Sequence, residues 1–98
     1  MNSIQTDLNE VLTDVQDVTG ITADTVLAVT RKRDVVDARQ LAYAALRSRE
    51  HSYETIGEAM NRDHGSVSSG CKAIGGYATY EKKTMWRMEQ LRQKGYAV

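Results

Sequence analysis

The chain has 98 residues, of which 41 % are hydrophobic and 27 % charged, and it contains neither proline nor phenylalanine. A chain of this length forms one domain with one modest core. No stretch approaches the roughly 18 apolar residues of a membrane span, and the N-terminus lacks the basic start of a secretory signal. Since Cys71 is the single cysteine, an internal disulfide is excluded, and we expect a cytoplasmic protein.

Charge is unevenly distributed along the chain, although the formal net charge is zero. The first 28 residues carry five acidic and no basic side chains, whereas residues 29–98 carry all 13 basic side chains against 8 acidic ones. The zero sum by itself argues against a nucleic-acid binder. The asymmetry instead indicates an acidic arm and a basic body that faces a polyanion.

Apolar periodicity and helix-capping residues predict an all-α protein of five or six helices, without the alternation typical of strands. The predicted elements are, in chain order, an acidic amphipathic helix over 1–20, a short helix over 21–27, a basic loop at 31–33, a helix from an N-cap at Asp34 to about residue 49, a helix from Ser52 to Met60, a helix from a cap at Asp63 to Gly75 and Gly76, and a last helix from Tyr80 that frays near Gly95. In the last helix, Met85, Met88 and Leu91 share one apolar face.

Two of these helices, joined by a tight turn over residues 52–74, have the spacing of a helix-turn-helix. In such a unit the second helix enters the DNA major groove, and its N-terminal residues contact base edges. Those residues here begin at Arg62, Asp63 and His64. Two helices and a turn are common in all-α proteins, so this pattern alone does not decide the function.

A family resemblance adds to this pattern. The segments 62–67 (Arg-Asp-His-Gly-Ser-Val) and 71–74 (Cys-Lys-Ala-Ile) resemble the signature of the DNA-binding domain of the bacterial replication initiator DnaA. That family typically reads Gly-Arg-Asp-His-Thr-Thr-Val and then Ala-Cys-Arg-Lys-Ile. The segments 21–27, 31–40 and 52–60 are similar, in order, to the family's short helix, its basic loop with the next helix, and its first helix-turn-helix element.

This resemblance covers about residues 11–75 and implies a small Trp-repressor-like domain of five to six helices that binds double-stranded DNA. The family inserts an arginine, here Arg31, into an A/T-rich minor groove, whose narrow and negative shape attracts such a side chain. Base reading in the major groove is implied for Asp63 and His64. Phosphate contacts are implied for Arg39, Gln40, Arg47 and Ser66. Additional candidates for DNA contact are Arg33, Arg62, Gly65, Ser69 and Lys72.

Four positions depart from the family pattern. Gly65 stands where the family has a threonine that helps to read the DNA box, and Glu54 stands where a proline is usual beside the DNA. Ser69 replaces a histidine that can reach the DNA backbone, and Asp37 occupies a position that is often basic or neutral. We therefore expect DNA binding with a preferred sequence other than the family's usual box.

Catalytic and metal chemistry find no support in the sequence. No G-x-x-x-x-G-K-[ST] loop is present to bind a nucleotide. No pair of histidine and cysteine residues has zinc-site spacing, and the adjacent residues Asp63, His64 and Ser66 cannot point at one another as a triad. We therefore expect neither an enzyme nor a metal, cofactor or nucleotide site.

We expect a single DNA-binding domain over 1–98, made of the acidic helix at 1–20, the helix-turn-helix core with its basic loop at 21–76 and the C-terminal helix at 77–98. The sequence leaves open the role of the acidic helix and the function of the whole domain. The acidic helix 1–20 either closes the core, presents its charge to a protein partner or a second copy, or weakens DNA affinity. The leading interpretation is sequence-specific DNA binding in replication initiation or its regulation. The alternatives are a protein-interaction module and a small transcriptional regulator of a phage or mobile element, both built on the same fold.

Overall fold

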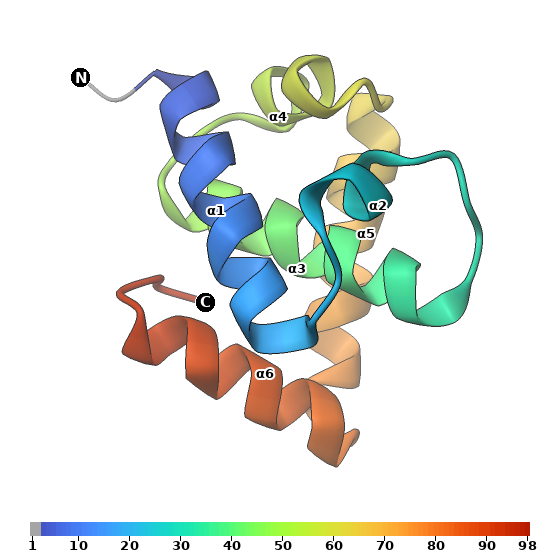
Figure 1. The fold of residues 1–98 in the computed structure, drawn as a ribbon, viewed down its shortest axis with the longest axis vertical. Helices are drawn as coiled ribbons and strands as arrows, with labels where there is room; N and C mark the ends of the chain where they lie inside the picture. Colours follow the sequence, from blue (N-terminus) through green and yellow to red (C-terminus); the bar gives the residue numbers. More distant parts are fainter. Residues whose placement is uncertain (1–2) are drawn as a thin grey trace.

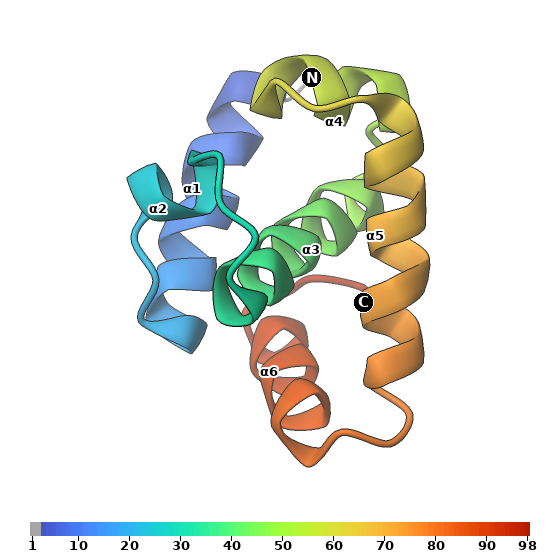
Figure 2. The same ribbon diagram turned by 90° about the vertical axis from the view of Figure 1, so that its right-hand side faces the viewer.

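The computed structural model describes residues 3–98, which form six α-helices and no strand. In chain order the helices are α1 (Ile4–Thr19), α2 (Ala23–Leu27), α3 (Arg33–Ser48), α4 (Tyr53–Met60), α5 (His64–Tyr77) and α6 (Lys82–Gln93). Helix α3 runs through the middle of the molecule and packs against α1, α2, α4 and α5 (Figure 1, Figure 2). The all-α prediction is confirmed. In the described part of the chain, no helix is long and apolar enough to cross a membrane.

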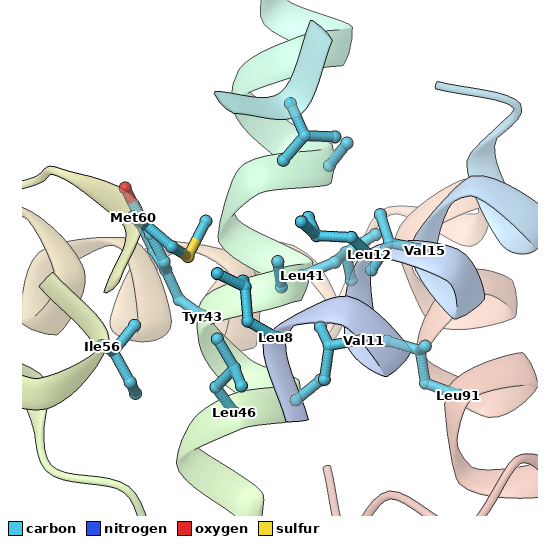
Figure 3. Close-up of a cluster of buried hydrophobic side chains, with 14 of the residues drawn as sticks. Leu8, Val11, Leu12, Val15, Leu41, Tyr43, Leu46, Ile56, Met60 and Leu91 are labelled. Atoms are coloured by element: carbon cyan, nitrogen blue, oxygen red, sulfur yellow. The ribbon is translucent and has the colours of Figure 1, made fainter. Parts of the chain in front are cut away.

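The core forms where α1 crosses α3, with contributions from α4 and α6 (Figure 3). The apolar stripe of α1 supplies Leu8, Val11, Leu12 and Val15. These side chains meet residues of the other helices, among them Leu41, Leu46, Ile56, Met60 and Leu91. Burying one such side chain contributes roughly 1.5–3 kcal/mol to folding. The periodicity that predicts the first helix therefore also identifies its buried face.

Capping residues set both ends of α1. The Ser3 side chain accepts a hydrogen bond from the backbone N–H of Thr6, which satisfies one of the free donors of the first turn. Gly20 ends the helix in the left-handed conformation, with φ of 78°, where a residue without Cβ is favoured. Residues 1–2 of the predicted acidic helix lie outside the described residues.

Two predicted helix boundaries in the second half of the chain are wrong. Helix α5 does not stop at Gly75 and Gly76 but continues to Tyr77, because neither glycine leaves the helical conformation and Tyr77 packs against the core. Helix α6 begins at Lys82 rather than at Tyr80. Glycine lowers helix stability by about 1 kcal/mol, and tertiary packing of the next residue outweighs that cost.

The N-cap prediction for α3 is also wrong by two residues. The helix begins at Arg33 with Lys32 in the cap position, and Lys32 makes no side-chain capping bond. Asp34 lies within the first turn, where its carboxylate accepts from the backbone N–H of Val35. An acidic side chain there still interacts favourably with the positive end of the helix dipole.

The C-terminal segment differs from the prediction in two ways. Met85 is 45 % exposed rather than buried, while Met88 and Leu91 do face the interior. The chain beyond Gly95 does not fray, because Tyr96 is buried and its hydroxyl donates to Asp14 of α1 at 2.6 Å. The tail is therefore fastened to α1.

The acidic side chains of α1 are paired with basic groups of the body. Asp7 is 2 % exposed and contacts both Arg49 and His51. Arg49 also holds Glu10 at 2.8 Å, and Lys94 holds Asp17 at 2.6 Å. These contacts favour the interpretation that α1 closes the core, because they leave little free charge on it for a partner or for repulsion of DNA.

Candidate nucleic-acid interface

Helices α4 and α5 are joined by a turn of defined geometry. Asn61 adopts the left-handed conformation with φ of 55°, and the backbone N–H of Arg62 donates to the carbonyl of Gly57 at 2.7 Å. This is the Schellman pattern, which satisfies the free carbonyls at a helix C-terminus. Asp63 then caps α5 by accepting from the backbone N–H of Gly65 at 3.0 Å.

The turn folds back so closely that Gly57 has no room for a side chain. A Cβ added there would overlap the backbone carbonyl oxygen of Arg62 and would meet the backbone nitrogen of His64 at 3.4 Å. A backbone atom cannot move aside as the end of a flexible side chain can. The glycine at this position thus sets the angle between α4 and α5.

Helix α5 packs against α3 through Val67, Ile74 and Gly70. Gly70 lies so close to the ring of Tyr43 that an added Cβ would be 2.7 Å from it. The opposite face of α5 is open to solvent, and its exposed residues include His64, Ser66, Ser69 and Lys72. This face is the predicted recognition surface, and apart from His64 and Lys72 its exposed side chains are short.

The two residues predicted to read bases project from the N-terminus of α5. The side chains of Asp63 and His64 are 72 % and 64 % exposed. They line a shallow hollow together with Glu54, Glu58 and other residues of the turn. The predicted base readers are therefore accessible, and Glu54, one of the four departures from the family pattern, lies beside them.

The basic loop between α2 and α3 lies next to the start of α5. Arg31 is exposed, and Val29 is 99 % exposed at the tip of the loop. A hollow is lined by Val29, Thr30, Arg31, Arg39, Arg62 and Ser66, so the structure brings Arg31 and Ser66 to one surface. In Figure 2 this loop faces the viewer, and α5 runs along the right-hand side of the picture. Nothing in the sequence marks Val29 as an exposed residue.

Arg39, a predicted phosphate contact, is engaged by backbone carbonyls of the protein. Arg39 is 8 % exposed, and its Nε donates to the carbonyl of Val26 at 2.9 Å. Its Nη2 donates to the carbonyl of Ala28 at 2.7 Å. Burial lowers the pKa of this guanidinium, whose partners among the described residues are backbone carbonyls. In this structure the Arg39 guanidinium therefore holds the start of the basic loop through these carbonyls.

Arg33 is also engaged within the protein. Its Nε lies 3.0 Å from both carboxylate oxygens of Asp37, and its Nη2 lies 2.9 Å from Glu81. The same guanidinium stacks over the ring of Tyr77 at 4.6 Å. Arg33 thus ties the start of α3 to the segment before α6, and Asp37, another departure from the family pattern, is one of its partners.

The remaining predicted contacts are more open. Arg47 is exposed, donates to the carbonyl of His51 at 3.2 Å and stacks over Tyr53 at 5.3 Å. Gln40 is half-buried beside Gly70, and its buried Oε1 has no hydrogen-bond partner among the described residues. Arg47 is therefore available at the surface of α3, whereas Gln40 reaches it only in part.

Arg62 is half-buried and binds two separate segments. Its Nη1 donates to the carbonyls of Asn61 at 3.1 Å and Met60 at 3.3 Å. Its Nη2 donates to the carbonyls of Ala28 at 3.0 Å and Leu27 at 3.3 Å. The family resemblance makes Arg62 a candidate for DNA contact, and the sequence gives no sign of this structural role, because the loop carbonyls that Arg62 binds are 34 and 35 residues away.

The comparisons with known proteins agree with this geometry. The family described as "Bacterial dnaA protein helix-turn-helix" matches residues 8–74. The chain belongs to this family. No curated protein and no solved structure matches the chain. The matched range begins in α1, includes the basic loop and the helix-turn-helix, and ends in α5. The domain is therefore a DNA-binding helix-turn-helix of the DnaA type, and α6 lies beyond the matched range.

Proposed function

We propose that this domain binds a specific double-stranded DNA sequence through both grooves and acts in replication initiation or its regulation. In this proposal α5 enters the major groove and Arg31 enters the adjacent minor groove. The observation that carries it is the shared surface of the basic loop and the start of α5, where Arg31 and Ser66 line one hollow. Such a site would be used at the bacterial nucleoid.

In the major groove, Asp63 and His64 are the proposed base readers. A carboxylate accepts hydrogen bonds from the amino groups of cytosine or adenine, and an imidazole can bond several base edges. Beyond them, Gly65 has no side chain, and the exposed positions Ser66 and Ser69 carry only short ones. Short side chains let the helix backbone approach the base edges closely, so the first turn of α5 carries most of the proposed reading.

Contacts to phosphate set the position of the protein on the duplex. Arg47, Ser66 and Lys72 are the exposed candidates for these contacts, and Gln40 is a partly buried one. Glu54 and Glu58 are exposed near the same surface and oppose phosphate. We therefore expect moderate affinity that falls steeply with salt. The logarithm of the binding constant should fall with the logarithm of the salt concentration, with a slope of about −0.9 for each phosphate neutralised.

The test begins with selection of bound duplexes from a random pool. The selected duplex and a scrambled duplex are then titrated at two salt concentrations with the wild-type chain, Arg31→Ala and His64→Ala. We expect preference for the selected duplex, a clear salt slope, and a loss of about fivefold to a hundredfold in affinity for each variant. A wild-type chain that binds both duplexes equally, or binds neither, would favour the protein-interaction module instead.

Restoring the family's threonine at Gly65 is expected to add a base preference. An added Cβ there meets only the Asp63 carboxylate that caps α5, at 2.8 Å, so this side chain must shift slightly in Gly65→Thr and in Gly65→Ser alike. In duplexes selected by Gly65→Thr, we expect one further thymine, bound about fivefold to a hundredfold more tightly than other bases because of its methyl group. Replacing that thymine by uracil removes the methyl and should remove the gain. Gly65→Ser is the matched control, and an equal gain on the uracil duplex would contradict the prediction.

A further inference from the structure

The C-terminal end of α2 is held by side chains from other helices. This helix has only five residues, and its cap residue Ala28 is extended rather than left-handed. The last carbonyls of a helix need partners outside the helix. Here the carbonyls of Val26, Leu27 and Ala28 accept from two guanidinium groups, those of Arg39 and Arg62. The start of the basic loop is thereby fixed by two cations.

The two arginines hold the loop to different parts of the fold. Arg39 is buried and belongs to α3, so it fastens the loop to the core. Arg62 belongs to the turn of the helix-turn-helix and directly precedes Asp63, the N-cap of α5. One planar guanidinium therefore bridges the carbonyls of the turn and those of the loop.

We infer that Arg62 is a positioning residue that fixes the register between the minor-groove loop and the major-groove helix. This inference rests on the proposed function and deepens it. The loop carries Arg31 and the helix carries Asp63 and His64, so reading both grooves together requires a fixed separation between them. Arg62 supplies that restraint without contacting a base. In its absence α5 still reads the major groove, while Arg31 loses its defined place.

The variant Arg62→Lys separates this role from simple attraction to phosphate. Lysine keeps the positive charge, but its compact ammonium cannot span both pairs of carbonyls as the guanidinium fork does. Arg92→Lys is the matched control, because the Arg92 guanidinium also donates to a backbone carbonyl, that of Val98 at 2.7 Å, but it lies in α6, away from the loop, the turn and the proposed DNA contacts. Circular dichroism and thermal melting establish that each variant is folded.

The probe is the duplex selected from the random pool, with the A·T pairs of its minor-groove segment replaced by G·C or by inosine·C. Guanine places an amino group in the minor groove and inosine does not. The wild-type chain should bind the G·C duplex weakly, and its affinity should be restored on the inosine·C duplex. For Arg62→Lys we expect the ratio of the affinities for the inosine·C and G·C duplexes to fall by about tenfold. The preference for the selected bases of the major-groove segment and the dependence of affinity on salt should not change. Arg92→Lys should keep the minor-groove discrimination.

Three results would overturn the inference while the proposed function stands. In the first, Arg62→Lys keeps its minor-groove discrimination. In the second, both discriminations fall together with the melting temperature, which makes Arg62 a stabilising residue only. In the third, Arg92→Lys loses the same discrimination as Arg62→Lys. A wild-type chain that distinguishes none of the duplexes overturns the proposed function itself, so the two failures are separable.

Discussion

Replacing Gly57 by alanine is expected to lower the free energy of unfolding by about 3 kcal/mol, at the upper end of the usual cost of overpacking. The new methyl would overlap the carbonyl oxygen of Arg62, a backbone atom in the turn between α4 and α5. That turn is held by the bond from the Arg62 N–H to the Gly57 carbonyl. The chain can make room only by opening the turn, which also displaces Asp63 and α5.

The matched control for Gly57→Ala is Gly75→Ala. Gly75 lies inside α5, and an added Cβ there meets nothing within 4 Å, so the better helix former should stabilise the protein by about 0.5–1 kcal/mol. Urea unfolding followed by circular dichroism measures both changes, and titration with the selected duplex should show weaker binding for Gly57→Ala alone. Equal free energies of unfolding for the two variants would mean that the turn accommodates the added methyl group, and would contradict the prediction.

The sequence predicts those parts of this fold that local signals determine. The apolar spacing of Leu8, Val11 and Val15 identifies α1 and its buried face, and Gly20 marks its end. Asp63 is recognisable as the N-cap of α5. Each of these features depends on residues within one or two helical turns, so the amino-acid pattern is sufficient to place them.

The functions of the arginines depend on distant partners and are not predictable in this way. Arg31, Arg33 and Arg39 follow one another within nine residues of the basic segment, yet only Arg31 among them is free of partners in the described range. Arg39 is buried against carbonyls of the preceding loop, and Arg33 is paired with Glu81, 48 residues away. A sequence pattern records the charge of such residues, whereas tertiary packing decides whether that charge faces DNA.

Partners that are distant in the sequence also explain the acidic character of the first 28 residues. Asp7, Glu10 and Asp17 pair with Arg49, His51 and Lys94, which come from the segment after α3 and from the C-terminal tail. Part of the acidic charge that brings the net charge of the chain to zero is thus paired with basic side chains inside the fold. The exposed cations that remain near the proposed DNA surface include Arg31, Lys32, Arg47 and Lys72.

The most consequential of these pairs is expected to be that of Asp7. Its carboxylate is 2 % exposed, with His51 Nε2 at 2.6 Å and Arg49 Nη1 at 2.8 Å. Replacing Asp7 by asparagine should lower the free energy of unfolding by about 3 kcal/mol at neutral pH, because it removes one partner of a buried charged pair. Asp17→Asn is the matched control: Asp17 is 70 % exposed, and solvent screens its pair with Lys94, so little change is expected.

The pH dependence distinguishes loss of charge from loss of packing at Asp7. The hydrogen bond from His51, together with Arg49, holds the pKa of the Asp7 carboxyl below its ordinary value of about 3.9. The stabilisation is therefore complete above that ordinary value and is lost as the pH falls through the lowered pKa. Urea unfolding of the wild type and Asp7→Asn should show a gap in stability at pH 7 that narrows at pH 3 and below. A gap of the same size at both pH values would mean that Asp7 stabilises α1 through its shape alone.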